Sequence, residues 1–425
     1  MSRATPVDTH PSPEFPTAPM SSFGLVRQPI FDRKEAAIGY ELRFRDPEDG
    51  SDPFARSYLS GSYDIFRSGL PAFVRVTREQ LLAGVCKAPD PRTVVVLLPP
   101  DLQPDEEVLK SLSELTATGV VLGLDDFRLP TGAGSPVLPL LAQAKWVRLD
   151  LRSYDPAVLR QLVAALKRQG KSAIADHVLD SSAHSDCVTM GFEAFQGSHF
   201  SRPESLPQAE IPTSTATAIR LLALSRDANT SERELERVVS GDPGITFQLL
   251  RIVNSAAIGG QGISSILHAL RLVGRNNLVR WLALASYTAR TGKSGVDDEL
   301  IRQAVQRAHL AEALARFGPR KDSGAAFLVG LFSLLDAVFR MPLRDVLDRV
   351  NLAEEVRSAL LDREGIYSDL LQVIESYELG MWELAAEQSI AAGIPADQLA
   401  ELYAESLRWA EEQIPTPKTR LPKAG

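Results

Sequence analysis

The feature that most limits how this chain can fold is a regular alternation of short β-rich runs with helical stretches between residues 23 and 203. The β-rich runs cover residues 73–76, 93–98, 120–125, 146–149 and 171–175. The helical face of one intervening stretch, residues 155–168, consists of Val158, Leu162, Val163 and Leu166. Strands that alternate with helices predict a parallel sheet, and an alternation of this length favours a closed α/β barrel of the TIM type.

The pattern changes beyond residue 205, where a linker with two prolines is followed by helix signals and by no convincing strand. Ser231 and Glu234 form a capping box, Asp242 is expected to cap the next helix, and Gly274 is placed at a helix end. These signals predict an all-α domain. We therefore divide the chain into a disordered, proline-rich segment 1–22, a barrel domain 23–205, a helical domain 206–413 and a flexible tail 414–425.

Composition excludes several classes of protein. The chain has 425 residues, 44% of them hydrophobic, and a net charge of -8, which argues against a large nucleic-acid footprint. No apolar run is long enough to cross a bilayer. The two cysteines, Cys86 and Cys187, lack the spacing of a metal site and fit a reducing compartment. We expect a cytoplasmic protein without membrane or nucleic-acid partners.

Polar side chains stand where the predicted strands end. In a parallel barrel these positions gather at one face, where reactive groups are usually found. They are Glu41, Arg75, Asp125, Asp126, Asp150, Asp176 and Gln196. Converging carboxylates hold hard divalent cations, and two such ions can position water against a phosphodiester. For any one acid alone, the alternative is a loop carboxylate that caps a helix or pairs with an arginine.

The order of these motifs resembles an EAL domain. The matching segments are QPI at 28–30, YELRFR at 40–45, LDDF at 124–127, VRLD at 147–150, IADHV at 174–178, QG at 196–197 and SRP at 201–203. The resemblance covers about residues 23–205. It implies a barrel fold and a relation to enzymes that hydrolyse cyclic di-GMP with divalent metal ions.

The helical half resembles an HDOD domain, most clearly in GDPGITFQLLRIVNS at 241–255, SSILHALRLVG at 264–274 and GLFSLLD at 330–336. Together the halves resemble signalling proteins in which an EAL-like domain precedes an HDOD domain. HDOD domains are similar to metal-dependent HD phosphohydrolases, but neither His268 nor His309 is followed by aspartate. Without an imidazole cluster we expect no metal there, and a structural role for both histidines. We interpret the stretch with Arg271, Arg275 and Trp281 as a solvated helix face rather than a nucleic-acid patch.

The resemblance implies an eroded catalytic set. The motif glutamate is kept as Glu41, the paired aspartates as Asp125 and Asp126, and the final glutamine as Gln196. Three family positions are replaced by Arg75, Leu97 and Arg148, the last standing where the family has its catalytic lysine. The final acidic motif of the family reads Ala175-Asp176-His177-Val178-Leu179.

Each replacement has a chemical meaning. Leu97 offers no oxygen to a metal, and Asp176 is one methylene shorter than the glutamate expected there. Arg75 brings a permanent cation, and Arg148 stays protonated at any working pH, so it cannot exchange a proton as a tuned lysine can. We therefore predict no metal cofactor. We expect magnesium or manganese to bind only if the chain retains residual phosphodiesterase activity. The ligands would then be Glu41, Asp125, Asp126 and Asp176.

Binding is a separate question from catalysis. The positions at which the family contacts the dinucleotide are occupied by Gln28, Arg45, Arg148, Asp150 and Gln196. Arginine can neutralise phosphate charge without a metal. The alternative, which we favour, is that Arg75 and Arg148 form internal ion pairs with Glu41, Asp125 and Asp126 and close the pocket.

The sequence thus predicts a signalling protein of the cyclic di-GMP type that is not an active enzyme and that contacts other signalling proteins through its HDOD half. Two alternatives stay open, namely a cyclic di-GMP sensor without hydrolysis and a weak metal-dependent phosphodiesterase. EAL domains commonly dimerise through the loop after the paired aspartates. Because that loop departs from the family here, both a monomer and a homodimer stay open.

Overall fold

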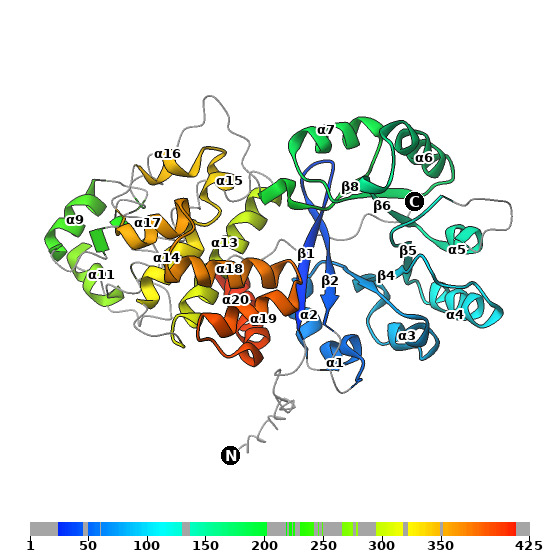
Figure 1. Ribbon diagram of the computed structural model, residues 1–425, viewed down its shortest axis with the longest axis horizontal. Helices are drawn as coiled ribbons and strands as arrows, with labels where there is room; N and C mark the ends of the chain where they lie inside the picture. The colour runs from blue at the N-terminus through cyan, green and yellow to red at the C-terminus, as the bar shows by residue number, and fades with distance from the viewer. Residues whose placement is uncertain are drawn as a thin grey trace, which may run out of the picture.

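The computed structural model describes residues 24–45, 50–59, 61–129, 137–201, 230–241, 266–274, 295–317, 322–348 and 352–413, with single residues between 218 and 278. The predicted disordered segment 1–22 and the tail 414–425 lie outside the described residues, as do the linker and Asp242. Figure 1 shows a barrel half and a helical half side by side. Within the described part of the chain, no helix is long and apolar enough to span a membrane.

Eight strands form a closed barrel in sequence order. They are β1 (Leu25–Asp32), β2 (Ala37–Phe44), β3 (Ala72–Arg75), β4 (Val94–Leu98), β5 (Val121–Leu124), β6 (Trp146–Asp150), β7 (Ser172–Asp176) and β8 (Ala194–Phe195). Strands β2 to β8 run parallel, whereas β1 runs antiparallel to both of its neighbours. The predicted barrel is confirmed, and the predicted runs form the parallel strands β3 to β7, whereas the antiparallel β1, which none of those runs covers, makes the sheet mixed.

The reversal of β1 follows from its short connection to β2. The Asp32 carboxylate accepts hydrogen bonds from the backbone N–H groups of Lys34 and Ala36, at 2.8 and 2.9 Å. A turn this short can only join antiparallel strands, because parallel neighbours need a crossover of a dozen or more residues. The pairing places Gln28 opposite Glu41.

Helices cover the outside of the barrel (Figure 1). They are α1 (Pro53–Leu59), α2 (Ser62–Arg67), α3 (Arg78–Leu82), α4 (Glu106–Ala117), α5 (Val137–Gln143), α6 (Pro156–Arg168) and α7 (Ser181–Met190), with short 3-10 turns that include Leu151–Ser153 and Ser198–Ser201. The face predicted for α6 needs one correction, since Val158 is 36% exposed and Leu159 is only 3% exposed. Leu159 lies three, four and seven residues before the other three buried positions, which is the helical spacing of one face.

The helical half contains only helices and short helical turns among its described residues. They are α9 (Glu232–Ser240), α11 (Ile266–Val273), α13 (Gly295–Leu314), α14 (Ser323–Phe332), α15 (Leu335–Phe339), α16 (Leu343–Leu347), α17 (Glu354–Leu361), α18 (Ile366–Glu378), α19 (Trp382–Ala391) and α20 (Leu399–Gln413). Ser231 caps α9 by accepting a hydrogen bond from the Glu234 backbone N–H, and Gly274, at φ +72°, ends α11 as predicted.

Helix α13 is the centre of this half. It packs against α14, α18 and α20, and most of its side chains are buried. Gly330 of α14 lies directly against it, because an added Cβ would come within 2.3 Å of the Arg307 carbonyl oxygen. Only glycine permits this approach of the two helices.

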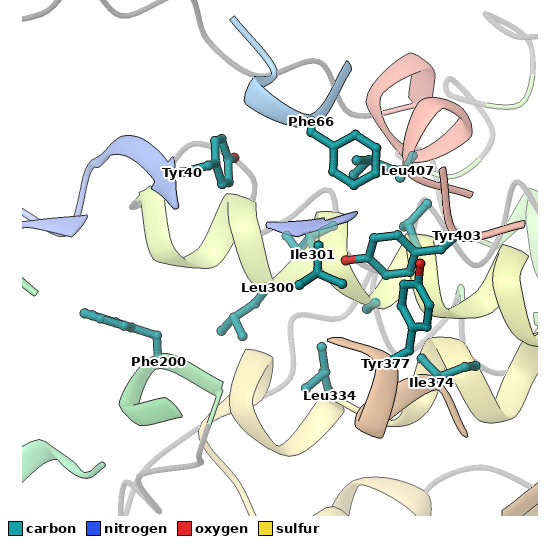
Figure 2. Packing of buried hydrophobic residues seen from close by; sticks show 14 of the residues in the cluster. Tyr40, Phe66, Phe200, Leu300, Ile301, Leu334, Ile374, Tyr377, Tyr403 and Leu407 are labelled. Atoms are coloured by element: carbon teal, nitrogen blue, oxygen red, sulfur yellow. The ribbon is translucent and has the colours of Figure 1, made fainter. Parts of the chain in front are cut away.

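One hydrophobic core continues from the barrel into the helical half. Figure 2 shows Tyr40, Phe66 and Phe200 from the barrel side together with Leu300, Ile301, Leu334, Ile374, Tyr377, Tyr403 and Leu407 from the helical side. A second, smaller core fills the barrel interior. Leu97 belongs to it and is 1% exposed, so its side chain takes part in apolar packing.

A buried polar cluster, which we call the interface cluster, joins the two halves. Arg27 and Tyr40 of the barrel wall meet Glu299 and Arg302 of α13 and Glu411 of α20. The Tyr40 hydroxyl donates to Glu299 Oε2 at 2.8 Å, and the Arg27 guanidinium lies 4.2 Å from the centroid of the Tyr40 ring. Charge-assisted hydrogen bonds between buried groups fix the relative position of the surfaces that carry them.

Candidate functional site

The strands bring a set of polar side chains together at one end of the barrel. Glu41 lies on β2, Arg148 on β6 and Asp176 at the end of β7, while Asp125 and Gln196 directly follow β5 and β8. All five are buried, with Asp125 and Gln196 fully so. We call these five residues the barrel cluster.

Arg148 stands at the centre of the barrel cluster. Its Nη1 lies 2.8 Å from Glu41 Oε1, its Nη2 lies 2.5 Å from Asp125 Oδ1, and its Nε lies 3.7 Å from Asp176 Oδ2. The guanidinium also donates to Gln196 Oε1 at 3.2 Å. One planar cation therefore donates hydrogen bonds to Glu41, Asp125 and Gln196 and lies within ion-pair distance of Asp176.

Gln196 extends the barrel cluster to β1. Its Nε2 donates to Glu41 Oε2 at 2.6 Å and to Gln28 Oε1 at 3.1 Å. Arg43 approaches the same glutamate from β2, with Nη2 3.1 Å from Glu41 Oε2. We did not single out Arg43 from the sequence. Its place two residues beyond Glu41 on the same strand, hence on the same face, was the available signal.

The electrostatics favour a charged glutamate beside a charged arginine. Burial raises the pKa of Glu41, but the Arg148 and Arg43 cations outweigh burial and hold that pKa at about 2. Burial would lower the pKa of Arg148, yet the carboxylates of Glu41, Asp125 and Asp176 raise it above its ordinary value. For Asp176, burial dominates over the Arg148 cation, and its pKa is raised.

The second arginine named from the sequence, Arg75, also pairs with the cluster. Its Nε lies 2.6 Å from Asp125 Oδ2, although more than half of its side chain is exposed. The interpretation of internal ion pairs therefore matches the geometry for Glu41 and Asp125. It does not match for Asp126, which instead lies 2.9 Å from Arg128 Nη2.

Two further residues proposed from the resemblance lie apart from this cluster. Asp150 accepts hydrogen bonds from the backbone and side chain of Arg152, which lower the pKa of its carboxyl group. Arg45 lies exposed beyond β2, with its backbone N–H donating to the Gly24 carbonyl. His177, which we did not predict as a site residue, lies between Asp150 and Asp176, because its Nδ1 is 3.5 Å from Asp150 Oδ1 and 3.3 Å from Asp176 Oδ2.

The residues present do not fit a metal ion. Among the described residues, no group of three or more histidine, cysteine, aspartate or glutamate side chains is arranged to hold one. The Glu41, Asp125 and Asp176 carboxylates converge on the Arg148 guanidinium at ion-pair distances instead. Introducing a divalent ion there would require Arg148 to leave.

The helical half shows no histidine cluster among its described side chains. The His309 ring stacks on Trp409 with ring centroids 4.9 Å apart, which is a packing role on α13. The His268 side chain, Arg275 and Trp281 lie outside the described part of the chain, whereas Arg271 pairs with Glu232 at 2.7 Å.

Comparison with known proteins gives matches to both halves. Residues 211–362 match the HDOD domain family. The chain is 26% identical over 401 residues to the protein YuxH of Bacillus subtilis, covering 91% of this chain and 97% of that protein. It is also 26% identical over 408 residues to the cyclic di-GMP phosphodiesterase CdgJ of Vibrio cholerae, covering 91% and 92%.

Solved structures give shorter matches. The Klebsiella pneumoniae BlrP1 calcium/cyclic di-GMP complex is 16% identical, with 45% of this chain and 58% of that chain covered and a TM-score of 0.37. The EAL domain of Mycobacterium smegmatis DcpA is 20% identical, with 41% and 90% covered and a TM-score of 0.33.

Proposed function

We propose that this chain, an EAL-like barrel followed by an HDOD domain, is a regulator in cyclic di-GMP signalling that does not hydrolyse the nucleotide. One observation carries the proposal. The Arg148 guanidinium stands among Glu41, Asp125 and Asp176, where divalent metal ions would need those oxygens free.

The chemistry of arginine explains the loss of hydrolysis. A metal ion lowers the pKa of bound water and so supplies a nucleophile at neutral pH, whereas a guanidinium only donates hydrogen bonds. Arg148 cannot act as a general base either, because its neighbours raise its pKa further. The cluster can hold charge in place, but it lacks a group that would activate water.

We assign the output to protein contacts made by the helical half. Four apolar side chains within residues 379–390 are exposed to solvent, namely Leu379, Met381, Leu384 and Ile390. Exposed apolar side chains that gather into one patch of the surface mark protein interaction sites. We propose for this reason that the contact with other signalling proteins lies on α19 and on the turn that precedes it.

A second candidate function is binding of cyclic di-GMP without cleavage. The Vibrio cholerae relative carries the name of a cyclic di-GMP phosphodiesterase, which favours a nucleotide-related origin for the barrel. Gln28 and Gln196 are hydrogen-bonded to each other, and Arg45 is exposed beyond β2. Residual metal-dependent phosphodiesterase activity is the third function to be tested against these two.

One experiment separates the three functions. Cyclic di-GMP is titrated calorimetrically into the purified full chain with and without magnesium or manganese, and products are followed by chromatography. We expect no hydrolysis under any of these conditions. Hydrolysis that disappears in Glu41→Ala but persists in Glu79→Ala, an exposed glutamate on α3, would contradict the proposal. Micromolar binding without products, lost in Arg45→Ala, would instead establish the sensor.

A further inference from the structure

Helices α17 to α20 carry more negative charge than the rest of the chain. Residues 352–413 contain fourteen acidic side chains and three basic ones, a net charge of -11, whereas the whole chain carries -8. The apolar side chains exposed around α19 lie within this acidic region. We propose that this surface binds a basic amphipathic helix of a partner protein, an inference that rests on the proposed function and adds the chemistry of the partner to it.

Acidic and apolar side chains are mixed on the exposed side of α19. We use the name α19 surface for the six exposed residues Leu379, Met381, Glu383, Leu384, Glu387 and Ile390. Side chains three or four residues apart are neighbours on a helix, so Glu387 lies beside both Glu383 and Ile390. Within the described part of the chain, neither glutamate forms an ion pair. A purely apolar partner would strip water from both carboxylates at a high cost, so the partner must supply cations.

The α19 surface is held in place by the opposite side of the helix. Ala385 and Ser389 are buried there, and Ser389 Oγ donates to the Ile394 carbonyl at 2.8 Å. The Trp382 ring packs edge-on against Tyr377, with centroids 5.1 Å apart. A surface that is already fixed loses little conformational freedom on binding, which favours its use as a docking site.

Two other occupants fit the charge less well. A symmetric contact with a second copy of the chain would bring Glu383 and Glu387 of both copies together, and like charges facing each other are unfavourable. Residues 1–22 lead into Gly24, where an added Cβ would come within 3.0 Å of the Trp382 ring. They contain one arginine, no lysine and two acidic side chains, so they offer too few cations. An amphipathic helix with lysine or arginine beside its apolar anchors supplies both kinds of contact.

The test uses the full-length chain and a fluorescent synthetic peptide of leucine and lysine, with leucine at helical spacing. A second peptide has glutamate in place of every lysine. By fluorescence anisotropy, we expect the lysine peptide to bind and to lose about tenfold in affinity between roughly 0.15 M and 1 M salt. Glu383→Lys combined with Glu387→Lys should weaken its binding about tenfold and create binding of the glutamate peptide. The control, Glu354→Lys with Glu355→Lys, makes the same change of net charge at exposed positions of α17 and should keep the parent's preference.

A second pair of variants tests the apolar contacts. Ile390→Ser should weaken binding of the lysine peptide about tenfold, whereas Ile366→Ser, at the exposed start of α18, should not. Because all these positions are exposed, the melting temperature should stay close to that of the parent chain.

Several results would overturn the inference. They are failure of the lysine peptide to bind, equal effects of the two charge-reversed variants, and displacement of the lysine peptide by a peptide of residues 1–22. Equal binding of both peptides that is lost in Ile390→Ser would exclude a basic partner and still leave the contact site on α19. Cyclic di-GMP hydrolysis by the same preparation would contradict the proposed function alone, so the two failures are distinguishable.

Discussion

The barrel cluster and the interface cluster meet at strands β1 and β2, whose two faces point toward different clusters. Gln28 and Glu41 point into the barrel toward Arg148, whereas their chain neighbours Arg27 and Tyr40 point outward toward α13. The alternation of side chains along a strand makes this possible. On each strand, one of two adjacent residues contacts or belongs to the barrel cluster, and the other belongs to the interface cluster between the two halves.

The two clusters differ in the number of buried arginines that pair with their carboxylates. In the interface cluster, Arg27 and Arg302 share the carboxylates of Glu299 and Glu411. In the barrel cluster, the one buried arginine meets three buried carboxylates, and the two other arginines that reach it, Arg43 and Arg75, are partly exposed. Buried charges that lose their partner are strongly destabilising, so the barrel cluster depends more on a single residue.

The largest effect is expected for Arg148→Met. The variant leaves Glu41, Asp125 and Asp176 buried without their shared cation, and its free energy of unfolding should fall by about 3–5 kcal/mol. Urea unfolding followed by circular dichroism measures the change. Arg92→Met, which removes an exposed pair with Asp90, is the control and should change stability by less than about 1 kcal/mol. Equal stability of the two variants would refute the central role of Arg148.

Acid should destabilise the protein through both clusters. The folded pKa of Glu41 is about 2 against an ordinary value of 4.5, and the pKa of Glu299 is also lowered against the effect of its burial by Arg302 and Arg27. A depressed pKa contributes stability that is present above the unfolded value and is lost as pH falls toward the folded one. For Glu41 the loss should reach about 3 kcal/mol between roughly pH 5 and pH 2.

Asp176 acts in the opposite direction, because its raised pKa contributes stability only at low pH and that contribution is lost as pH rises. Urea unfolding at a series of pH values measures the sum. In Glu41→Gln the acid-induced loss should shrink, and what remains should come largely from the interface. An unchanged pH dependence in that variant would show that Glu41 is not the titrating group.

Breaking the interface cluster should separate the halves at a smaller cost. In Arg302→Met, Arg27 still lies 3.7 Å from Glu299 and 3.2 Å from Glu411, so we expect a loss of about 2–3 kcal/mol. We also expect calorimetric unfolding to change from one transition toward two, because the halves would no longer unfold together. A single transition with unchanged stability would contradict a clamping role for this cluster.

The smallest effect is expected for Tyr40→Phe. The variant removes one hydroxyl that donates to Glu299 at 2.8 Å and leaves the ring beneath Arg27 in place. The loss should be roughly 1–2 kcal/mol in urea unfolding. Tyr58→Phe, on the partly exposed α1, serves as the matched control. If both variants lose the same free energy of unfolding, the hydrogen bond of the Tyr40 hydroxyl does not stabilise the interface.

Much of the barrel could be predicted from the sequence because its strands are continuous apolar runs. The predicted runs coincide with β3 to β7 within a residue or two, and the order of an EAL-like barrel and an HDOD domain is confirmed. The direction of β1 was missed because β-rich composition does not encode strand direction. The predicted domain boundaries and residue roles stay predictions.

The sequence named residues that the barrel brings together, but it did not show which of them contact each other. Asp126 and Asp150 turn to Arg128 and Arg152, each an arginine two residues ahead, and sequence order cannot show which way a short loop aims its carboxylate. Arg148 was named, but its central place depends on the closing of the barrel, which brings β2, β5 and β7 around it. The interface cluster escaped notice because Arg27 and Glu299 are too far apart in the sequence to suggest a contact.

The reversed first strand also has a consequence for how the chain is made. Strand β1 closes the barrel through only two paired positions with β8, Phe31 with Phe195 and Asp32 with Ala194. Its outer face is completed by α13 and α18, which are synthesised much later. Closing contacts between distant segments are slow, and domains usually fold as they leave the ribosome. We therefore expect the pairing of β1 with β8 to become stable only after α13 and α18 have left the ribosome.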